Sequence, residues 1–209
     1  INFILGILIF SFFMFYYGET WLPNSKVIEK GGVIVTDLGK SAGFETGDKV
    51  LSINGQEVEK FRDLINSSAY ISEGLNYGVV RNGASVTVPI SDSLRTQVLE
   101  SKGKLVLFSL RLEPIIGSTA PNGNAQKAGL LSNDKIVGID SIDVEYFDQL
   151  KVALSQYKNS QADLRIIREG GAMTLTTEVD SAGMIGVQVS NLAQYTDDLQ
   201  RTEYGFVES

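Results

Sequence analysis

The amino-acid sequence predicts an α+β protein in which one apolar helix precedes two copies of a small domain. The first observation is a run without charge at the start of the chain, Ile1–Tyr17. The second is a repeat, because Ala42–Leu64 aligns without a gap with Ala128–Leu150. The third is that each copy combines alternating apolar residues, typical of strands, with one segment of helical periodicity. Two copies of one domain explain this pattern better than a solenoid, which needs at least about three repeats.

The apolar run is expected to form a transmembrane helix over residues 1–22, truncated at its N-terminus, since a membrane helix needs roughly 20 apolar residues. Tyr16, Tyr17 and Trp21 lie where an aromatic belt would meet lipid headgroups. A cleaved signal peptide is disfavoured, because no basic stretch precedes the run and no small-residue cleavage site follows it. A buried core helix is disfavoured as well, because the run has no amphipathic face.

Identical residues at matching positions carry the repeat. They are Ala42/Ala128, Gly43/Gly129, Asp48/Asp134, Lys49/Lys135, Ile53/Ile139, Val58/Val144, Glu59/Glu145, Phe61/Phe147 and Leu64/Leu150. A second block, Val79–Val88, matches Ile166–Leu175 once one residue is inserted.

Each copy is expected to contain a lead-in strand, a short helical turn ending at Ala-Gly, a strand, a helix and a two-stranded hairpin. In the first copy these are Gly31–Asp37, Ala42–Gly43, Lys49–Asn54, Glu59–Ala69 and Tyr77–Ile90. In the second copy they are Leu112–Ser118, Ala128–Gly129, Lys135–Asp140, Glu145–Tyr157 and Asp163–Val179.

The turns carry a specific prediction about the backbone. Gly47 of the first copy is replaced by Asn133 in the second, and Asn is the residue that best replaces Gly in a left-handed conformation. We therefore expect a positive φ at both positions. Asn54-Gly55 predicts a tight turn, and its counterpart Asp140-Ser141 a weaker one.

Composition excludes several classes of function. The net charge of −7 disfavours nucleic-acid binding, which needs a basic surface. The chain of 209 residues contains no cysteine and no histidine. Thiolate or HExxH zinc sites, Ser-His-Asp triads and histidine bases are therefore excluded from this sequence.

The order of these elements, with Ala-Gly followed by the pattern G-D-x-V-x-x-I-N-G at Gly47–Gly55, resembles the bacterial PDZ domain. The resemblance implies two tandem PDZ domains, small partly open β-barrels with flanking helices. Tandem PDZ domains after an apolar helix resemble the central region of the site-2 protease family, the RseP-type intramembrane zinc metalloproteases. The zinc ligands of that family lie in HExxH and LDG-containing motifs, and neither occurs here. The resemblance thus implies zinc for the parent protein and no cofactor or catalytic residue in this chain.

This resemblance divides the expected soluble part into a first PDZ domain at 23–98, a linker at 99–103 and a second PDZ domain at 104–190. A juxtamembrane segment at 191–209 would lead to the next membrane helix. The linker region has one Gly and no Pro, and Ser93–Glu100 is expected to be helical, which favours a semi-rigid tandem.

A PDZ domain binds an extended peptide by strand addition beside a helix, and a loop of backbone N–H groups takes a terminal carboxylate. For the second copy we expect the strand within Leu105–Arg111, although it lacks the usual loop Gly. Gly183–Val189 resembles such a loop too, and remains open as either a structural strand or a binding loop. For the first copy the equivalent, Pro23–Gly32, has no pocket signature. The candidate peptide-binding residues are Leu107, Phe108, Ser109, Leu110, Phe147, Leu150, Lys151, Leu154, Ile185, Gly186 and Val187.

Phe147, Leu150 and Leu154 also fit a core-facing stripe, which is the more common role of apolar residues at helical spacing. The acidic group Asp140, Asp143, Glu145 and Asp148 lacks a calcium-loop pattern and fits a solvated helix start. Adjacent Ser-Lys pairs in loops are not expected to act as nucleophile and base.

Three functions are compatible with these features. The favoured one is a module, on the periplasmic side of the bacterial inner membrane, that gates or recognises pre-trimmed single-pass membrane proteins such as anti-sigma factors for a metalloprotease. Its partners would be the membrane and protein or peptide substrates, without nucleic acid. The alternatives are a membrane-tethered PDZ scaffold without protease activity and a serine protease of the HtrA type. The last fits poorly, because the apolar helix directly precedes the repeat.

Overall fold

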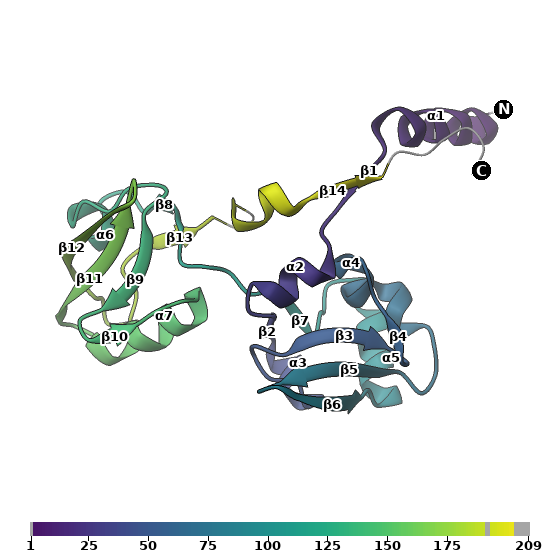
Figure 1. Cartoon of the computed structure of the whole chain (residues 1–209), viewed down its shortest axis with the longest axis horizontal. Helices are drawn as coiled ribbons and strands as arrows, with labels where there is room; N and C mark the ends of the chain where they lie inside the picture. The colour runs from purple at the N-terminus through teal and green to yellow at the C-terminus, as the bar shows by residue number, and fades with distance from the viewer. Residues whose placement is uncertain (1, 191–192, 203–209) are drawn as a thin grey trace. The chain divides into compact units, whose positions relative to one another are not determined.

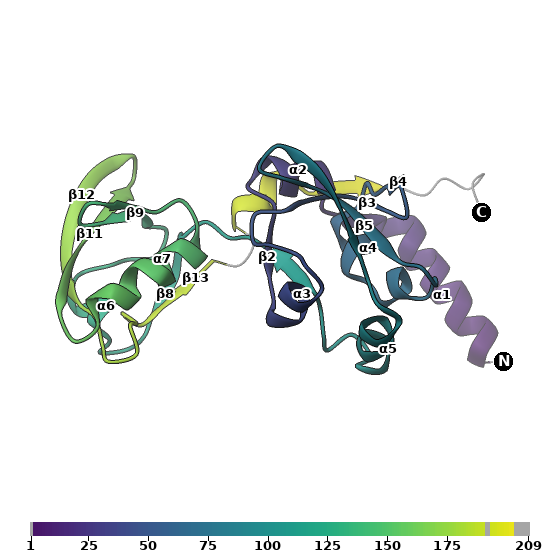
Figure 2. The same cartoon turned by 90° about the horizontal axis from the view of Figure 1, so that it is seen from below.

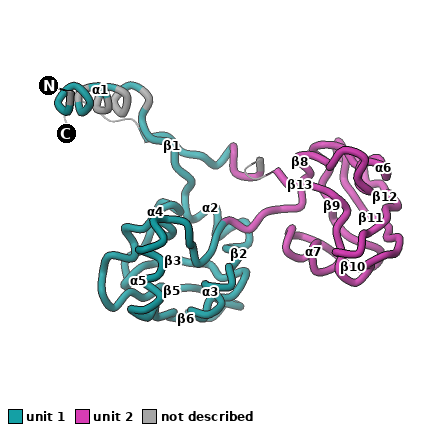
Figure 3. The backbone as a smooth tube through the Cα atoms, turned by 180° about the vertical axis from the view of Figure 1, so that it is seen from behind, with its two compact units in different colours: residues 1–109, 197–209 teal, residues 110–196 magenta. Residues whose placement is uncertain are grey.

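The computed structural model describes residues 2–190 and 193–202, which form a mixed α/β structure (Figure 1). The chain divides into two compact units (Figure 3). Unit 1 comprises residues 1–109 and 197–209, and unit 2 comprises residues 110–196. Unit 2 is therefore an insertion within the sequence of unit 1.

The apolar run forms helix α1, Asn2–Tyr17. The expected boundary at residue 22 is wrong, because Gly18 takes a φ of +63° and Glu19–Trp21 forms strand β1. Strand β1 pairs antiparallel with β14, Gln200–Thr202. Gly18 packs against the carbonyl oxygen of Thr202, where a Cβ atom would clash. Within the described residues, no helix combines the length and the apolar character needed to cross a membrane.

Unit 1 contains an open sheet of strand order β4-β3-β5-β6 and a separate pair, β2-β7. Its strands after β1 are β2 (Val33–Val35), β3 (Lys49–Ile53), β4 (Gln56–Glu57), β5 (Asn76–Arg81), β6 (Ala84–Pro89) and β7 (Phe108–Leu110). Its helices after α1 are α2 (Asn24–Glu29), α3 (Asp37–Ser41), α4 (Phe61–Ile65), the 3-10 helix η1 (Ser67–Tyr70) and α5 (Asp92–Glu100).

Unit 2 repeats this arrangement with the sheet β10-β9-β11-β12 and the pair β13-β8. Its strands are β8 (Ile116–Thr119), β9 (Lys135–Ile139), β10 (Ile142–Asp143), β11 (Gln161–Arg168), β12 (Gly171–Glu178) and β13 (Val187–Val189). Its helices are α6 (Asn124–Lys127), α7 (Phe147–Leu154) and the 3-10 helix η2 (Ser155–Tyr157), with α7 contacting β9 (Figure 2). The 3-10 helix η3 (Ala193–Asp198) follows β13. The described strands close no barrel in either unit.

The predicted left-handed turns are confirmed in both copies. Gly47 has a φ of +96° and Asn133 a φ of +70°. The φ of Asn54 is +50° and that of Asp140 is +46°, so the turn after β3 and the turn after β9 share a conformation. Sequence comparison between the two copies therefore identified a backbone requirement correctly.

A buried ion pair is also duplicated. Asp48 and Asp134 are each 1% exposed, and each accepts two hydrogen bonds from one guanidinium group. Arg81 donates to both Asp48 carboxylate oxygens at 2.8 Å, and Arg168 donates to those of Asp134 at 2.7 Å. The first pair ties the turn before β3 to the end of β5, and the second ties the turn before β9 to the end of β11.

The division between the units differs from the expected boundaries at 98 and 104. Strand β7 pairs with β2, so it completes unit 1. The Phe108 ring packs against Phe44 and Tyr77, with ring centres 5.1 and 5.8 Å away. The expected helix at Ser93–Glu100 is present as α5, but it lies between two strands of one unit. Of the expected segment 191–209, residues 191–192 and 203–209 lie outside the described residues.

Candidate peptide-binding site

Strand β13 of unit 2 has one open edge, because its partner within the described sheets is β8 alone. Val187 lies opposite Thr119, and the Ala120 N–H donates to the Gly186 carbonyl at 2.8 Å. This bond flanks the Val187–Thr119 pair, which makes it a non-hydrogen-bonded pair of the antiparallel ladder. The N–H and C=O groups of Val187 therefore point away from β8, toward the open edge.

The loop before β13 presents further donors. The Ile185 and Gly186 carbonyls accept hydrogen bonds from the Ala125 and Ala120 N–H groups, each at 2.8 Å. The N–H groups of Ile185 and Gly186 donate no hydrogen bond within the described parts of the chain. Gly186 has a φ of +79°. Successive free N–H groups in such a turn form a concavity that favours anions.

Asp180 holds this loop in shape. Its carboxylate accepts the N–H groups of Ala182 and Met184 at 2.9 and 2.8 Å. The main chain closes the same turn, since the Asp180 N–H donates to the Met184 carbonyl at 2.9 Å. The loop is thus ordered by its own hydrogen bonds before any ligand is present, which lowers the entropic cost of binding.

The loop before β13 lies against the C-terminal end of helix α7. A Cβ atom on Gly183 would lie 3.2 Å from the Ser155 Cα and 3.2 Å from the Lys158 Cε. Lys158 and Lys151 form no ion pair with the part of the chain that the structure describes. The Lys151 ammonium group lies 5.4 Å from the centre of the Phe147 ring. Of these two lysines, Lys158 is the one that lies beside the loop, and its positive charge there favours a carboxylate ligand.

The structure separates the candidate residues into two groups. Leu107 and Phe108 belong to the core of unit 1, and Ser109 and Leu110 complete β7. Leu107, Phe108 and Ser109 therefore lie in unit 1 and not in the second copy, whereas Leu110 is the first residue of unit 2 although it ends β7. The physical reason is that each unit is completed by a strand after its hairpin, so β7 closes the first copy before the second begins.

The second group belongs to unit 2. Leu150, Leu154 and Ile185 are buried core side chains, which agrees with the core-facing alternative for the first two. Phe147 and Val187 pack against the same core while remaining partly exposed. Lys151 is exposed and Gly186 half-buried, so these four residues and the main chain of β13 are the ones available to a ligand.

Unit 1 has an equivalent loop, which lies in the segment Leu105–Arg111 that the sequence analysis assigned to the second copy. The Thr36 N–H donates to the Leu107 carbonyl at 3.0 Å, and the Thr36 hydroxyl donates to the Val106 carbonyl at 2.8 Å. Within the described chain, the N–H groups of Val106 and Leu107 donate no hydrogen bond. Val106–Phe108 thus corresponds to Ile185–Val187. The sequence does contain a signal for this equivalence, since both stretches follow the hairpin of their copy. In the first copy, however, helix α5 lies between the hairpin and the loop and interrupts the alignment.

A zinc site does not fit the part of the chain that the structure describes. The described residues contain no group of three His, Cys, Asp or Glu side chains placed to hold a metal ion, and the sequence has neither His nor Cys. No chemistry of the chain is therefore assigned to a bound metal.

No family model matches the chain. Curated relatives do. The chain is 26% identical over 118 residues to the "Zinc metalloprotease RasP" of Geobacillus kaustophilus, covering 56% of this chain and 27% of the relative. It is 26% identical over 151 residues to the "Metalloprotease MmpA" of Caulobacter vibrioides, covering 72% of this chain and 34% of the relative. It is 31% identical over 108 residues to the "Probable protease eep" of Enterococcus faecalis, covering 51% of this chain and 25% of the relative.

The chain thus spans between a quarter and about a third of the length of these relatives. Their shared description as proteases matches the resemblance expected from the sequence. The chain is a relative of bacterial metalloproteases of the site-2 protease family.

Proposed function

We propose that this chain is the substrate-recognising region of a membrane-bound zinc metalloprotease, built from two PDZ-type units. It would lie on the periplasmic side of the inner membrane and screen single-pass membrane proteins after their outer domains have been trimmed. Anti-sigma factors are the type of substrate that the resemblance implies. The relationship to curated metalloproteases supports the protease context, and zinc and catalysis would belong to the parent protein.

The observation that carries the proposal is the open edge of β13 together with the free N–H groups of Ile185 and Gly186. An extended peptide would pair with the Val187 main chain, and its terminal carboxylate would accept the loop N–H groups. Trimming of a membrane protein creates a new chain end. A site that prefers a free carboxylate would therefore distinguish trimmed substrates from intact ones.

Peptide binding tests this directly. The chain is titrated with a peptide pool whose last four positions are randomised, carrying either a free carboxylate or a terminal amide. We expect the free-carboxylate pool to bind at least about tenfold more tightly, because charge-assisted hydrogen bonds to the loop are lost in the amide. Equal binding of the two pools, or no binding, would contradict the recognition proposal.

A matched pair of glycine variants locates the site. In Gly186→Ala the new Cβ atom would lie 3.3 Å from the Ala120 Cβ, and the φ of +79° is strained for alanine. Gly170→Ala carries the same backbone strain at a φ of +81°, in the hairpin between β11 and β12, with no atom within 4 Å. Only Gly186→Ala is expected to weaken binding. A scaffold without protease activity would give the same binding result and is distinguished by the cleavage assay that closes the Discussion.

A further inference from the structure

Unit 1 contains a cavity of about 450 Å³ that is separate from the strand edges of β7 and β13. Its wall is formed by residues of β1, α2, β4, the segment after β4, and β14, namely Trp21, Pro23, Asn24, Ser25, Ile28, Glu57, Val58, Glu59 and Gln200. Its volume falls within the roughly 300–1,000 Å³ of typical ligand pockets. Its lining is mixed, because polar side chains from α2, β4 and β14 lie beside apolar ones such as Trp21 and Ile28.

The charged side chains that line the cavity are both acidic, namely Glu57 and Glu59. Glu57 and Glu59 are exposed, and neither carboxylate forms an ion pair or a side-chain hydrogen bond with a described residue. The nearby basic side chains already have partners, since Lys60 and Arg62 both pair with Glu19. Two residues of the cavity wall thus carry carboxylates that have no ion-pair partner among the described residues. Such a wall favours a cationic ligand.

The aromatic wall favours the same ligand chemistry. The Trp21 ring is 8% exposed, and its Nε1 donates to the Thr202 hydroxyl at 2.9 Å, which holds the ring in place. The Lys60 ammonium group lies 5.3 Å from the ring centre. The indole therefore already attracts one cation of the chain, as expected for a cation–π partner.

The strands around the cavity favour an extended polypeptide over a small cation. Glu57 lies in β4, which is one of the two edge strands of the four-stranded sheet of unit 1. Trp21 and Gln200 lie in β1 and β14, a two-stranded pair whose outer edges are open within the described sheets. Edge strands present unpaired N–H and C=O groups to which an extended chain can add.

We propose that this cavity binds a lysine or arginine side chain carried on an extended polypeptide segment. The site does not depend on peptide binding at β13, because the two share no residue. Failure of one proposal would leave the other standing.

Trp21 is the only tryptophan of the chain, so its fluorescence reports on the cavity directly. The full chain, in detergent micelles, is titrated with the capped tripeptide acetyl-Val-Arg-Val-amide and with the neutral match acetyl-Val-Gln-Val-amide. Both peptides lack a free carboxylate, which keeps them from testing the loop before β13. We expect a saturable fluorescence change for the arginine peptide and none, or binding at least about tenfold weaker, for the glutamine peptide.

The double variant Glu57→Gln, Glu59→Gln is expected to weaken binding of the arginine peptide about tenfold or more. The matched control is Glu73→Gln, Glu178→Gln, which removes the same charge from exposed positions outside the cavity wall. Equal loss in both double variants would overturn the site, because it would reduce the effect to net charge. Equal binding of both tripeptides, no change in fluorescence, or tighter binding of spermidine than of the arginine peptide would also overturn it.

Discussion

At the residue scale, the two buried aspartates explain why Asp48 and Asp134 are identical in the two copies. Each carboxylate is removed from water and matched by a guanidinium fork and a main-chain N–H group, from Glu45 or Leu131. A buried carboxylate without such partners would be strongly disfavoured. The repeat therefore preserved an interaction that holds the turn before the first sheet strand.

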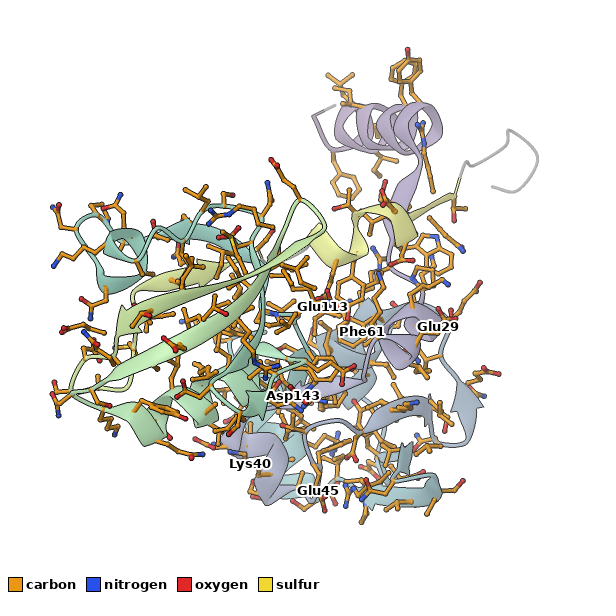
Figure 4. The ribbon with its side chains drawn as sticks, turned by 60° about the vertical axis from the view of Figure 1, so that its left-hand side comes forward. Glu29, Lys40, Glu45, Phe61, Glu113 and Asp143 are labelled. Atoms are coloured by element: carbon orange, nitrogen blue, oxygen red, sulfur yellow. The ribbon has the colours of Figure 1, made fainter. Side chains whose placement is uncertain are left out.

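Asp48→Asn is expected to destabilise unit 1 by about 3 kcal/mol, because it removes the buried carboxylate that pairs with the Arg81 guanidinium and leaves that group only its ion pair with the exposed Glu45. Urea unfolding of the chain measures this change. The control is Asp143→Asn (Asp143 is labelled in Figure 4), whose side chain is 90% exposed in its ion pair with Arg165. We expect the control to change stability by less than about 0.5 kcal/mol, and equal effects of the two variants would refute the explanation.

The ion pair between Asp134 and Arg168 predicts that the stability of unit 2 depends on pH. Burial raises the pKa of Asp134, but the hydrogen bonds from Arg168 and the Leu131 N–H outweigh burial and leave that pKa below its ordinary value. The folded state therefore favours the ionised form more than the unfolded state does. This contribution is complete above the unfolded pKa of about 4 and is lost as the pH falls through the folded pKa. The stability gap between wild type and Asp134→Asn should be constant above about pH 5 and shrink in acid. A gap that grows in acid would contradict this sign.

At the element scale, the closing strands β7 and β13 decide what the two units can bind. Both follow the hairpin of their unit, and both are preceded by a loop whose carbonyl groups are bonded and whose N–H groups are free. In unit 2 the connection from β12 is a short loop, whereas in unit 1 it contains α5. Buried Val98 and hydrogen bonds from Arg95 to the Tyr70 and Ile71 carbonyls hold this helix against η1.

Proline variants test the open edge of β13. In Val187→Pro the missing N–H is the one that points away from β8, so strand pairing is retained while strand addition is blocked. We expect peptide binding to fall more than about tenfold with little loss of stability. In Gln188→Pro the missing N–H belongs to the residue opposite Ser118, on the paired side, so the unit itself is expected to be destabilised. Loss of stability in the first variant alone would show that the edge was assigned in the wrong direction.

An element could be predicted from the sequence when neighbouring residues determine it, and could not be predicted when it depends on pairing between distant segments. The turns at Gly47 and Asn133, the helix α7 and both hairpins are encoded by neighbouring residues and were predicted from the repeat. The role of β7 was not, since its pairing with β2 joins distant segments and α5 hides its equivalence to β13. The pairing of β1 with β14 left no local signal either, because it joins segments such as Trp21 and Thr202 that are 181 residues apart.

At the scale of the whole molecule, unit 2 begins and ends within the sequence of unit 1. The chain leaves unit 1 after β7 and returns to it at residue 197, where β14 pairs with the strand that follows α1. An ion pair between Lys30 and Asp198 supports this return. The segment after α1 and the segment approaching residue 202 are therefore held together by unit 1.

This organisation predicts that the two units unfold separately. Phe108→Ala removes a fully buried ring from the Phe44–Tyr77 cluster and is expected to destabilise unit 1 by about 3–5 kcal/mol. Hydrogen exchange should accelerate in β5 and remain unchanged in β11. Ile185→Ala in the core of unit 2 should have the reverse effect. If Phe108→Ala accelerated exchange in β11 instead, the assignment of β7 to the second copy would be correct after all.

Cleavage by the full-length parent in membranes tests whether the chain recognises trimmed substrates for a metalloprotease. A model single-pass substrate carries either a bulky or a trimmed outer domain. The parent is compared with a variant in which residues 110–196 are replaced by a short Gly-Ser linker, which leaves unit 1 intact. We predict that the parent cuts only the trimmed substrate, that the variant also cuts the bulky one, and that a zinc chelator abolishes all cutting. Unchanged discrimination in the variant, or no cutting under any condition, would contradict the proposed role of the chain in substrate recognition.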